Sequence, residues 1–423
     1  MLCTQKAEKC HRGCCYNLDH FLLSCACINM SINQIPHYDV AIVGAGPAGA
    51  LAAYEVAKAG LQCVILEKEC LPRYKVCGGG LIYKARKALD IDIGAAIERE
   101  LTVTEIALFG STKIYHTPPQ EKPMVTMVMR DQFDQILIKA ACEKGAELLE
   151  AFALKALKVN GDDVHLTDAS GRKVSAKMVI GADGANSAVG RLGGWGHFEA
   201  VAPALECELT VSDVDMARFS GAARFDLDIP KDGYGWIFPK GQHLSIGVGR
   251  FFNKERINLH QTLDAYLAHL GLQAYADKTV HGFVIPLHPR KEGAILGRLF
   301  LVGDAAGFAD PVLGEGLSSA ILSGIAVGKA IAASDMDLAR AKVDYQRYID
   351  EKVLGDLATA RKLASFCYLS PTMRNWLLAK SPERLITAMT KIIMGESQYM
   401  DYQMRFMNKL KFWGSVKSGL IID

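Results

Sequence analysis

Three glycines, Gly44, Gly46 and Gly49, are spaced as G-x-G-x-x-G, and this spacing constrains the fold more than any other feature of the chain. An apolar, β-rich run at residues 38–43 precedes them, and an alanine-rich helical pattern at residues 50–59 follows. In such a unit the first glycine permits a tight turn, the second lets the backbone approach a pyrophosphate, and the third lets helix and strand pack closely. The helix N-terminus then offers free N–H groups and a positive dipole end to the phosphates. The spacing therefore predicts a dinucleotide-binding turn.

A carboxylate follows where a nucleotide site of this kind needs one. Residues 62–66 form a second apolar run, and Glu67 ends it, 23 positions after Gly44. The two runs and the helix between them predict a βαβ unit that starts a parallel sheet. At the end of the second strand, a carboxylate accepts hydrogen bonds from a ribose and repels a ribose 2′-phosphate. Neither the glycines nor Glu67 distinguish NAD from FAD.

The rest of the chain is patterned as several domains. With 423 residues, the chain is long enough for two or three domains of about 100–200 residues. Its 50% hydrophobic and 22% charged residues are typical of a globular protein. Two β-rich stretches interrupt the α/β pattern, and the last part of the chain is helical in pattern. We predict an N-terminal extension outside the fold (residues 1–36), a discontinuous cofactor-binding domain (37–95, 125–199 and 285–345), a substrate-binding β domain (96–124 and 200–284) and a helical C-terminal region (346–423).

Half of the 12 cysteines crowd the first 27 residues. Cys10 and Cys14, or Cys25 and Cys27, do not give the two ligand pairs that a structural zinc site uses. The apolar stretch beside them is too short for a signal peptide. We therefore expect an extension without a metal site. The other cysteines show no disulfide framework, which favours a reducing cytoplasm.

Charge and hydropathy exclude two classes of protein. Lys and Arg number 48 against 46 Asp and Glu, so the chain lacks the basic character of a nucleic-acid-binding domain. No run reaches the roughly 18 uncharged apolar residues of a membrane-spanning helix. From residue 370 onward, eight Lys and Arg face four Asp and Glu among apolar and aromatic side chains. This tail either packs on its own domain as an amphipathic helix or rests on an anionic membrane surface.

Two later motifs place an aspartate after a predicted strand. Asp183 follows residues 173–180 within Gly-Ala-Asp-Gly, and Asp304 follows residues 299–302 within Gly-Asp-Ala-Ala-Gly. An aspartate at a strand end binds sugar hydroxyls, and nearby glycines let the backbone approach a ring or a phosphate. Asp183 is equally suited to cap a helix, and Asp304 to form a turn.

Together with the glycine fingerprint, these motifs resemble those of FAD-dependent enzymes with the p-hydroxybenzoate hydroxylase fold. The resemblance implies a Rossmann-like FAD-binding domain with an inserted antiparallel β domain. It implies that the first motif holds the ADP part of FAD and that Asp304 holds the ribityl chain. It also places Gly316 and Leu317 near the flavin ring, and Asp183 near FAD and a nicotinamide nucleotide.

Three further segments narrow the resemblance: residues 72–81 with Cys77, a helix start at Arg130, and Tyr234-Gly-Trp236-Ile-Phe238. The combination resembles the geranylgeranyl reductase family, which saturates prenyl chains of chlorophyll precursors, archaeal lipids or quinones. Arg130 is either a partner of the pyrophosphate or a surface arginine. Cys77, the catalytic candidate, is either beside the flavin or a small buried side chain. The cofactor-binding residues expected on this basis are Gly44, Gly46, Ala48, Gly49, Glu67, Gly78, Gly79, Arg130, Leu154, Asp183, Asp304, Gly316 and Leu317.

Tyr234, Trp236 and Phe238 share parity on a predicted strand and present one aromatic face. This face is either ordinary core or the wall of a slot for a prenyl chain, and the resemblance favours the slot. Reduction of an isolated alkene needs a hydride from reduced flavin, a proton and a dry pocket. His288, Tyr234 and Cys77 are the candidate proton donors, and the residues do not discriminate between them.

The leading hypothesis is an FAD-dependent reductase that hydrogenates isolated C=C bonds of a prenyl chain on a lipid, quinone or pigment precursor. Its electrons would come from NADPH or ferredoxin, and its location would be cytoplasmic or peripheral to a membrane. One alternative is an aromatic monooxygenase or halogenase, although the Trp-x-Trp-x-x-Pro signature of halogenases is absent from the sequence. Another is a non-enzymatic prenyl-binding escort. The sequence leaves the identity of the prenyl substrate and the oligomeric state open.

Overall fold

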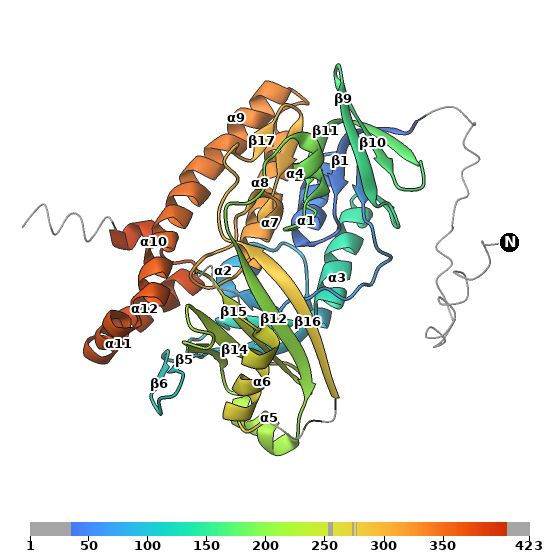
Figure 1. Cartoon of the computed structure of the whole chain (residues 1–423). Coiled ribbons are helices and arrows are strands. Elements are labelled where there is room, and N and C mark those ends of the chain that lie inside the picture. The colour runs from blue at the N-terminus through green and yellow to red at the C-terminus, as the bar shows by residue number, and fades with distance from the viewer. Residues whose placement is uncertain (1–34, 253–256, 273–274, 276, 404–423) are drawn as a thin grey trace, which may run out of the picture. The chain divides into compact units, whose positions relative to one another are not determined.

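A computed structural model describes residues 35–252, 257–272, 275 and 277–403 (Figure 1). The cysteine-rich stretch and the last residues of the tail lie outside the described residues, so the expectations for them stay predictions. Among the described residues, no helix is both long and apolar enough to cross a membrane. The predicted α/β fold, with a Rossmann-like parallel sheet, an inserted antiparallel sheet and a helical C-terminal region, is confirmed.

The parallel sheet is centred on β1 (His37–Val43), which lies between β11 (Lys173–Gly181) and β2 (Cys63–Leu66) and is parallel to both. Its last residues, Val40 to Val43, are buried in one hydrophobic core with the neighbouring strands and α1, which is why the run is apolar throughout. The remaining strands of this sheet are β8 (Glu147–Leu149), β9 (Leu154–Asn160), β10 (Asp163–Asp168), β17 (Ile295–Leu296) and β18 (Leu299–Leu301).

Small residues let two helices cross in close contact on this sheet. The helix of the glycine fingerprint, α1 (Pro47–Lys58), packs on α8 (Leu317–Ala332) and on α3 (Arg130–Glu143). A Cβ added at Gly324 of α8 would lie 2.3 Å from the carbonyl oxygen of Ala48, so the two backbones touch. This contact packs the middle of α8 against the N-terminal end of α1.

The inserted sheet has two faces of different character. Its strands run in the order β16-β12-β15-β14-β13-β5-β6, antiparallel except for the β13–β5 pair. One face carries apolar residues such as Ile237 and Ile246, and these pack against Tyr266 of α6 (Leu259–His269). Because side chains alternate along a strand, the intervening residues point to the other face. The strands are β5 (Thr104–Leu108), β6 (Ile114–His116), β12 (Val201–Thr210), β13 (Ala223–Leu227), β14 (Gly233–Pro239), β15 (Leu244–Arg250) and β16 (Asp277–Pro286).

A small third sheet connects the two larger ones. It consists of β3 (Gly80–Ile82), β7 (Val125–Val128) and β4 (Ile97–Leu101) in the order β3-β7-β4. Its strands come from both sides of the domain boundaries proposed at residues 96 and 124, since β4 pairs with β7. The division of these residues between two domains stays a prediction.

The helical C-terminal region packs on the inserted sheet and on the loops beside it (Figure 1). The ring of Tyr368 stacks on Phe251 with centroids 5.3 Å apart, and the Tyr399 hydroxyl donates a hydrogen bond to Asp310 Oδ2 at 2.9 Å. Arg374 lies 2.5 Å from a carboxylate oxygen of Asp228. The helices are α9 (Leu338–Ile349), α10 (Gly355–Leu369), α11 (Pro371–Lys380) and α12 (Pro382–Ile393).

Candidate active site

A cavity of about 730 Å³ is lined both by residues at the C-terminal ends of the parallel strands and by residues of the inserted sheet. Most of the predicted site residues line this cavity, although they come from segments far apart in the sequence. The exception among the cofactor candidates is Gly49, which does not line it. Those that do are Gly44, Gly46, Ala48, Glu67, Cys77, Gly78, Gly79, Arg130, Leu154, Asp183, Tyr234, Trp236, Phe238, Asp304, Gly316 and Leu317.

Close backbone contacts explain two of the fingerprint glycines. Gly44 has φ +105°, and a Cβ there would lie 2.5 Å from the carbonyl oxygen of Ala182. A Cβ at Gly49 would lie only 1.9 Å from the carbonyl oxygen of Gly44. Both positions therefore exclude any side chain. Gly49 packs the helix onto the turn, as expected for the third glycine of the fingerprint, and its place among the cofactor-binding residues stays a prediction.

Two arginines lie over the N-terminal end of α1. A Cβ added at Gly46 would have an Nη2 atom of Arg130 at 3.9 Å and one of Arg73 at 4.0 Å as its nearest neighbours. Both guanidinium groups bind Asp134: Arg130 through Nε and Nη2 at 2.8 and 2.9 Å, and Arg73 through Nη1 at 3.0 Å. The helix end itself has no side-chain cap. The uncapped helix end and the two arginines together place positive charge at this end of the cavity, an arrangement that suits an anion.

Arg130 is buried rather than on the surface, with 9% of its area exposed. Burial lowers the pKa of its guanidinium, but Asp134 and Cys77 raise it by more, so the charge is held. Arg73 belongs to the segment that carries the family resemblance, yet sequence reasoning did not single it out. Its role depends on Asp134, which lies in a different part of the chain.

The Glu67 carboxylate connects the glycine turn to the loop after β2. Its Oε2 accepts a hydrogen bond from the backbone N–H of Ala45 at 2.7 Å, and its Oε1 accepts one from Glu69 at 3.1 Å. Only 3% of the residue is exposed, and it lines the cavity. The carboxylate therefore positions the turn and also lies where a ribose would approach.

Asp183 caps a helix. Its carboxylate accepts hydrogen bonds from the Ser187 hydroxyl at 2.5 Å and from the backbone N–H groups of Ala188 and Val189 at 2.6 and 3.0 Å. These groups form the N-terminal end of α4 (Ala188–Gly193). Burial raises the pKa of Asp183, while these bonds act in the opposite direction. The structure thus matches the capping role, with the side chain at the edge of the cavity.

Asp304 differs from Glu67 and Asp183 because one of its carboxylate oxygens has no partner among the described residues. It lies in the short helix α7 (Gly303–Ala306) after β18, and its Oδ1 is buried without a hydrogen bond to any described residue. Burial raises the pKa of this carboxyl group. A Cβ added at Gly316 would lie 2.7 Å from the same Oδ1, so only glycine leaves the oxygen open. A buried acceptor of this kind fits a ligand that supplies a hydroxyl donor.

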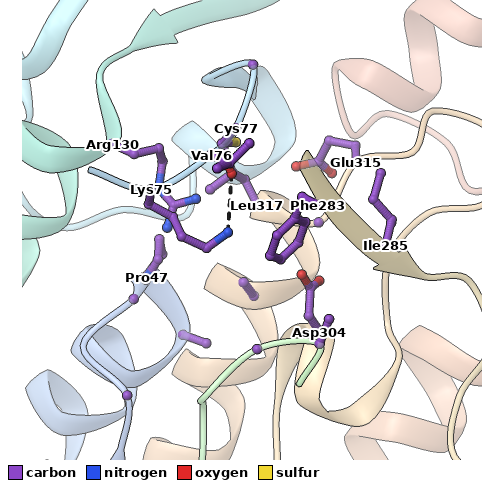
Figure 2. Close-up of a pocket in the computed structure, with 18 of the residues that line it drawn as sticks. Pro47, Lys75, Val76, Cys77, Arg130, Phe283, Ile285, Asp304, Glu315 and Leu317 are labelled. Atoms are coloured by element: carbon purple, nitrogen blue, oxygen red, sulfur yellow. Dashed lines mark hydrogen bonds between the residues drawn. The ribbon is translucent and has the colours of Figure 1, made fainter. Parts of the chain in front are cut away.

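Lys75 projects into the centre of the cavity (Figure 2). Its ammonium donates a hydrogen bond to the carbonyl oxygen of Val76 at 3.2 Å and lies 3.5 Å from the centroid of the Phe283 ring. Burial, with the nearby Arg130 charge, lowers its pKa to about 8. Cys77 follows on the same loop and is half-buried, and its sulfur accepts a hydrogen bond from Gly79 N at 3.4 Å.

The predicted aromatic face forms the apolar end of the cavity. The Tyr234 ring lies 6.2 Å from Trp236, 5.5 Å from Phe225 and 5.2 Å from Phe251, measured between centroids. Trp236 and Phe238 are 6.4 Å apart. All of these rings line the cavity. The face is thus both core and cavity wall, because its rings pack on each other while their other edges border the open space.

Two of the candidate proton donors are poorly placed. His288 does not line the cavity, and its Nδ1 lies 3.8 Å from Glu199 instead. The Tyr234 hydroxyl donates its hydrogen bond to the carbonyl oxygen of Leu313, and burial raises its pKa. Cys77 remains in the cavity.

Sequence reasoning missed two carboxylic acids that line the cavity, the buried Glu206 and the half-buried Glu315. Burial raises the pKa of each to about 7. Glu315 accepts a hydrogen bond from the backbone N–H of Ser318 at 2.6 Å, so it caps the start of α8. The available signal for Glu206 was its place in β12, where it alternates with the apolar residues Leu205 and Cys207.

Comparisons with known proteins agree with this geometry. A family model described as an FAD binding domain matches residues 37–231. A chloroplastic geranylgeranyl diphosphate reductase of Oryza sativa is 30% identical, over 74% of this chain and 70% of that protein. A digeranylgeranylglycerophospholipid reductase of Thermoplasma acidophilum is 30% identical over 68% of this chain and 76% of that protein.

A solved structure gives the same result at the level of the fold. The crystal structure of a geranylgeranyl bacteriochlorophyll reductase-like protein from Thermoplasma acidophilum has a TM-score of 0.70 and 26% identity. The match covers 78% of this chain and 87% of that one. The sequence relatives match the chain over most of their own length. The chain therefore belongs to the geranylgeranyl reductase family of FAD-dependent oxidoreductases.

Proposed function

We propose that the protein is an FAD-dependent reductase that saturates isolated C=C bonds of a prenyl chain carried by a lipid, quinone or pigment precursor. One observation carries the proposal: a single cavity joins an arginine-lined anion site at the glycine fingerprint to an aromatic wall. The first end suits a dinucleotide and the second suits an unsaturated hydrocarbon chain. The names of the relatives supply the substrate class.

The residues of the cavity fit FAD at each position where the cofactor needs a partner. Gly44, Gly46 and Ala48, with Arg73 and Arg130, would hold the pyrophosphate, and Glu67 the ribose. The unpartnered Oδ1 of Asp304 would accept a hydrogen bond from the ribityl chain. Gly78, Gly79, Leu154, Asp183, Gly316 and Leu317 would border the rest of the cofactor. The bound flavin supplies hydride-transfer chemistry there.

The chain's own part in the reaction is to bind, orient and shield the substrate. Rings of Tyr234, Trp236 and Phe238 provide a rigid apolar surface for a flexible prenyl chain and exclude water from it. Because the wall and the anion site share one cavity, a chain on the wall lies beside whatever the anion site holds. Lys75 and Cys77 also line the cavity, and Cys77 is a candidate for contact with the reacting atoms.

An anaerobic reoxidation experiment tests the proposal. The purified protein is reduced with dithionite and mixed with geranylgeranyl diphosphate or a prenyl quinone, and the visible flavin absorbance is followed. We expect alkene-dependent reoxidation and a product heavier by two hydrogens for each bond reduced. Bound flavin that ignores prenyl chains but reacts with oxygen and an aromatic compound would instead indicate a monooxygenase. A protein without flavin that still binds prenyl chains would indicate an escort. Mixing the oxidised protein with NADPH or with reduced ferredoxin then identifies the electron donor.

We propose that the junction of α10 and α11 is a surface for peripheral membrane contact. Leu369, Met373 and Trp376 are more than half exposed there, at 54%, 57% and 58%. Lys380 and Arg384 are exposed on the residues that follow. Apolar side chains beside basic ones are the composition that binds the surface of an anionic bilayer. We expect this junction to bring the protein to the membrane in which a prenyl lipid resides.

A further inference from the structure

The proposed reduction needs a proton, and the inserted sheet places one buried acid where a prenyl chain would lie. Glu206 lies on β12, lines the cavity, and is only 2% exposed. Its Oε1 accepts a hydrogen bond from the Ser245 hydroxyl at 2.6 Å. Its Oε2 is buried and accepts no well-aligned hydrogen bond from a described residue, although the backbone N–H of Cys77 lies close enough to lower the pKa of the carboxyl group. An isolated buried carboxylate is costly, so the free oxygen is better suited to carry a proton than a charge.

The strand register brings Glu206 to the end of the aromatic wall. Across the sheet, Glu206 pairs with Gly247, which pairs with Trp236, which pairs with Phe225. Directly paired residues project from the same face of a sheet, so the four positions form one row facing the cavity. Glu206 is the one acid in this row.

Gly247 lets the indole of Trp236 lean towards Glu206. A Cβ added at Gly247 would lie 2.0 Å from Cζ2 of Trp236, so the ring occupies the space above the glycine. Gly247 belongs to β15, which lies between β14 and β12, so the indole extends from β14 across β15 towards β12. A chain lying on the indole therefore ends beside the Glu206 carboxyl group.

We propose that Glu206, as a carboxylic acid, donates the proton that completes the reduction of each double bond. The inference rests on the proposed function. Bound reduced flavin would supply a hydride, with its electron pair, to one carbon of the double bond. The π electron pair would form the C–H bond of the other carbon with the Glu206 proton, and Glu206 would be left as a carboxylate. A proton from water restores the acid before the next bond is reduced.

The groups around Glu206 keep it protonated near neutral pH. Burial raises its pKa to about 7, and the neighbouring Glu208 carboxylate adds to this effect. Lys240 and the Ser245 hydrogen bond act in the opposite direction. Lys240 is itself held by Glu208 at 2.9 Å. The titratable or polar groups that face Glu206 from the elements packed on it are Tyr74, Cys77, Glu208, Lys240, His243, Ser245 and His281.

Glu206→Gln is the direct test, because glutamine keeps the size of the side chain and removes the acidic proton. In single-turnover reoxidation by geranylgeranyl diphosphate, we expect the wild-type rate to fall as pH rises through about 7. The variant should react about 10²–10⁴-fold more slowly and lose this inflection. Its affinities for FAD and for the prenyl substrate should be unchanged. Glu143→Gln removes an exposed carboxylate from α3 and is the matched control.

Infrared spectroscopy supplies a readout that does not depend on turnover. The wild type should show the C=O band of a protonated carboxylic acid that disappears as pH rises through about 7. The wild-type minus Glu206→Gln difference spectrum isolates this band from that of Glu315. Glu208→Gln should move the inflection to lower pH, because the carboxylate that raises the pKa is gone. Ser245→Ala should move it to higher pH, because the hydrogen bond that lowers the pKa is lost.

The outcomes separate this inference from the function on which it rests. If wild type is reoxidised by prenyl chains and Glu206→Gln matches its rate and pH profile, Glu206 is not the donor and the reductase stands. If the infrared band is absent throughout the pH range, Glu206 is ionised and the inference is also wrong. If no prenyl substrate reoxidises the wild type, the proposed function is wrong, and so is the role of Glu206 as its proton donor.

Discussion

The two halves of the cavity differ in how completely their carboxylates are hydrogen-bonded. At the parallel sheet, Glu67, Asp134 and Asp183 each accept two or more hydrogen bonds from backbone groups, a hydroxyl or arginines. On the inserted sheet, Glu206 shares one oxygen with Ser245 and leaves the other free beside an aromatic wall. A carboxylate whose oxygens all have hydrogen-bond partners stabilises the local fold. A buried carboxylate oxygen without a partner marks a place where a ligand binds or reacts.

Asp304 is the exception that makes the comparison informative. It belongs to the parallel-sheet half, yet its Oδ1 is as isolated as the free oxygen of Glu206. The difference therefore follows what each group faces rather than the domain it comes from. Asp304 opens towards the proposed flavin site, and Glu206 towards the proposed prenyl site. The following substitutions test whether the fully hydrogen-bonded residues stabilise the fold while the unpartnered ones bind ligands.

Gly49→Val should have the largest effect. The new side chain would start 1.9 Å from the carbonyl oxygen of Gly44, so the turn and α1 must separate. We expect the free energy of unfolding to fall by roughly 3 kcal/mol or more and the purified protein to be colourless. Thermal denaturation and flavin absorbance measure both effects. Gly221→Ala is the control, because a Cβ there meets nothing within 4 Å. A stable, yellow Gly49→Val protein would contradict the packing role.

Asp304→Ala and Asp183→Ala form a pair within the same half. Removing the isolated Asp304 acceptor should weaken FAD binding by roughly 10–100-fold, as for a lost hydrogen bond to a charged group, with little loss of stability. Removing the Asp183 cap should lower the free energy of unfolding by about 1–2 kcal/mol and affect FAD binding less. Fluorescence titration of the apoprotein with FAD, alongside urea denaturation, measures both quantities. Equal effects on FAD binding would break the distinction.

Trp236→Ala and Ile237→Ala compare the two faces of β14. Trp236 lines the cavity, so its loss should raise the KM for a prenyl substrate, by about 10-fold, and leave FAD binding intact. Ile237 is fully buried against α6, so its loss should cost about 2–4 kcal/mol of stability and leave KM unchanged. Steady-state kinetics and denaturation separate the two. An unchanged KM in Trp236→Ala would remove the aromatic wall from the substrate site.

Met373→Ser with Trp376→Ser should have the smallest effect on the fold. Both side chains are exposed, so stability should change by less than about 0.5 kcal/mol each. Cosedimentation with vesicles that contain anionic phosphatidylglycerol should nevertheless fall several-fold. Val214→Ser removes an apolar side chain that is 73% exposed on α5 (Asp213–Phe219) and should leave sedimentation unchanged. Equal loss in both proteins would show that the junction of α10 and α11 has no special role.

Local patterns in the sequence determined much of this protein. The glycine spacing predicted β1, the turn and α1, because close contact between consecutive elements leaves no room for side chains. The parity of Tyr234, Trp236 and Phe238 predicted a shared face, because side chains alternate along any strand. The motifs around Cys77, Arg130 and Asp304 gave the family, which the comparisons confirm.

Tertiary structure decided the role of the polar groups whose partners are distant, whereas Asp183 finds its partners within six residues. Asp183 and Asp304 both follow strands in glycine-rich motifs, yet Asp183 is hydrogen-bonded to the start of a helix, whereas Oδ1 of Asp304 has no partner among the described residues. Arg73 acquires its place through Asp134, and Glu206 through its register with Gly247 and Trp236. These partners lie some 30 to 60 residues away in the sequence. A local pattern predicts which element forms and which side chains share a face. Whether a buried charged group finds a hydrogen-bond partner depends on which distant segment packs against it.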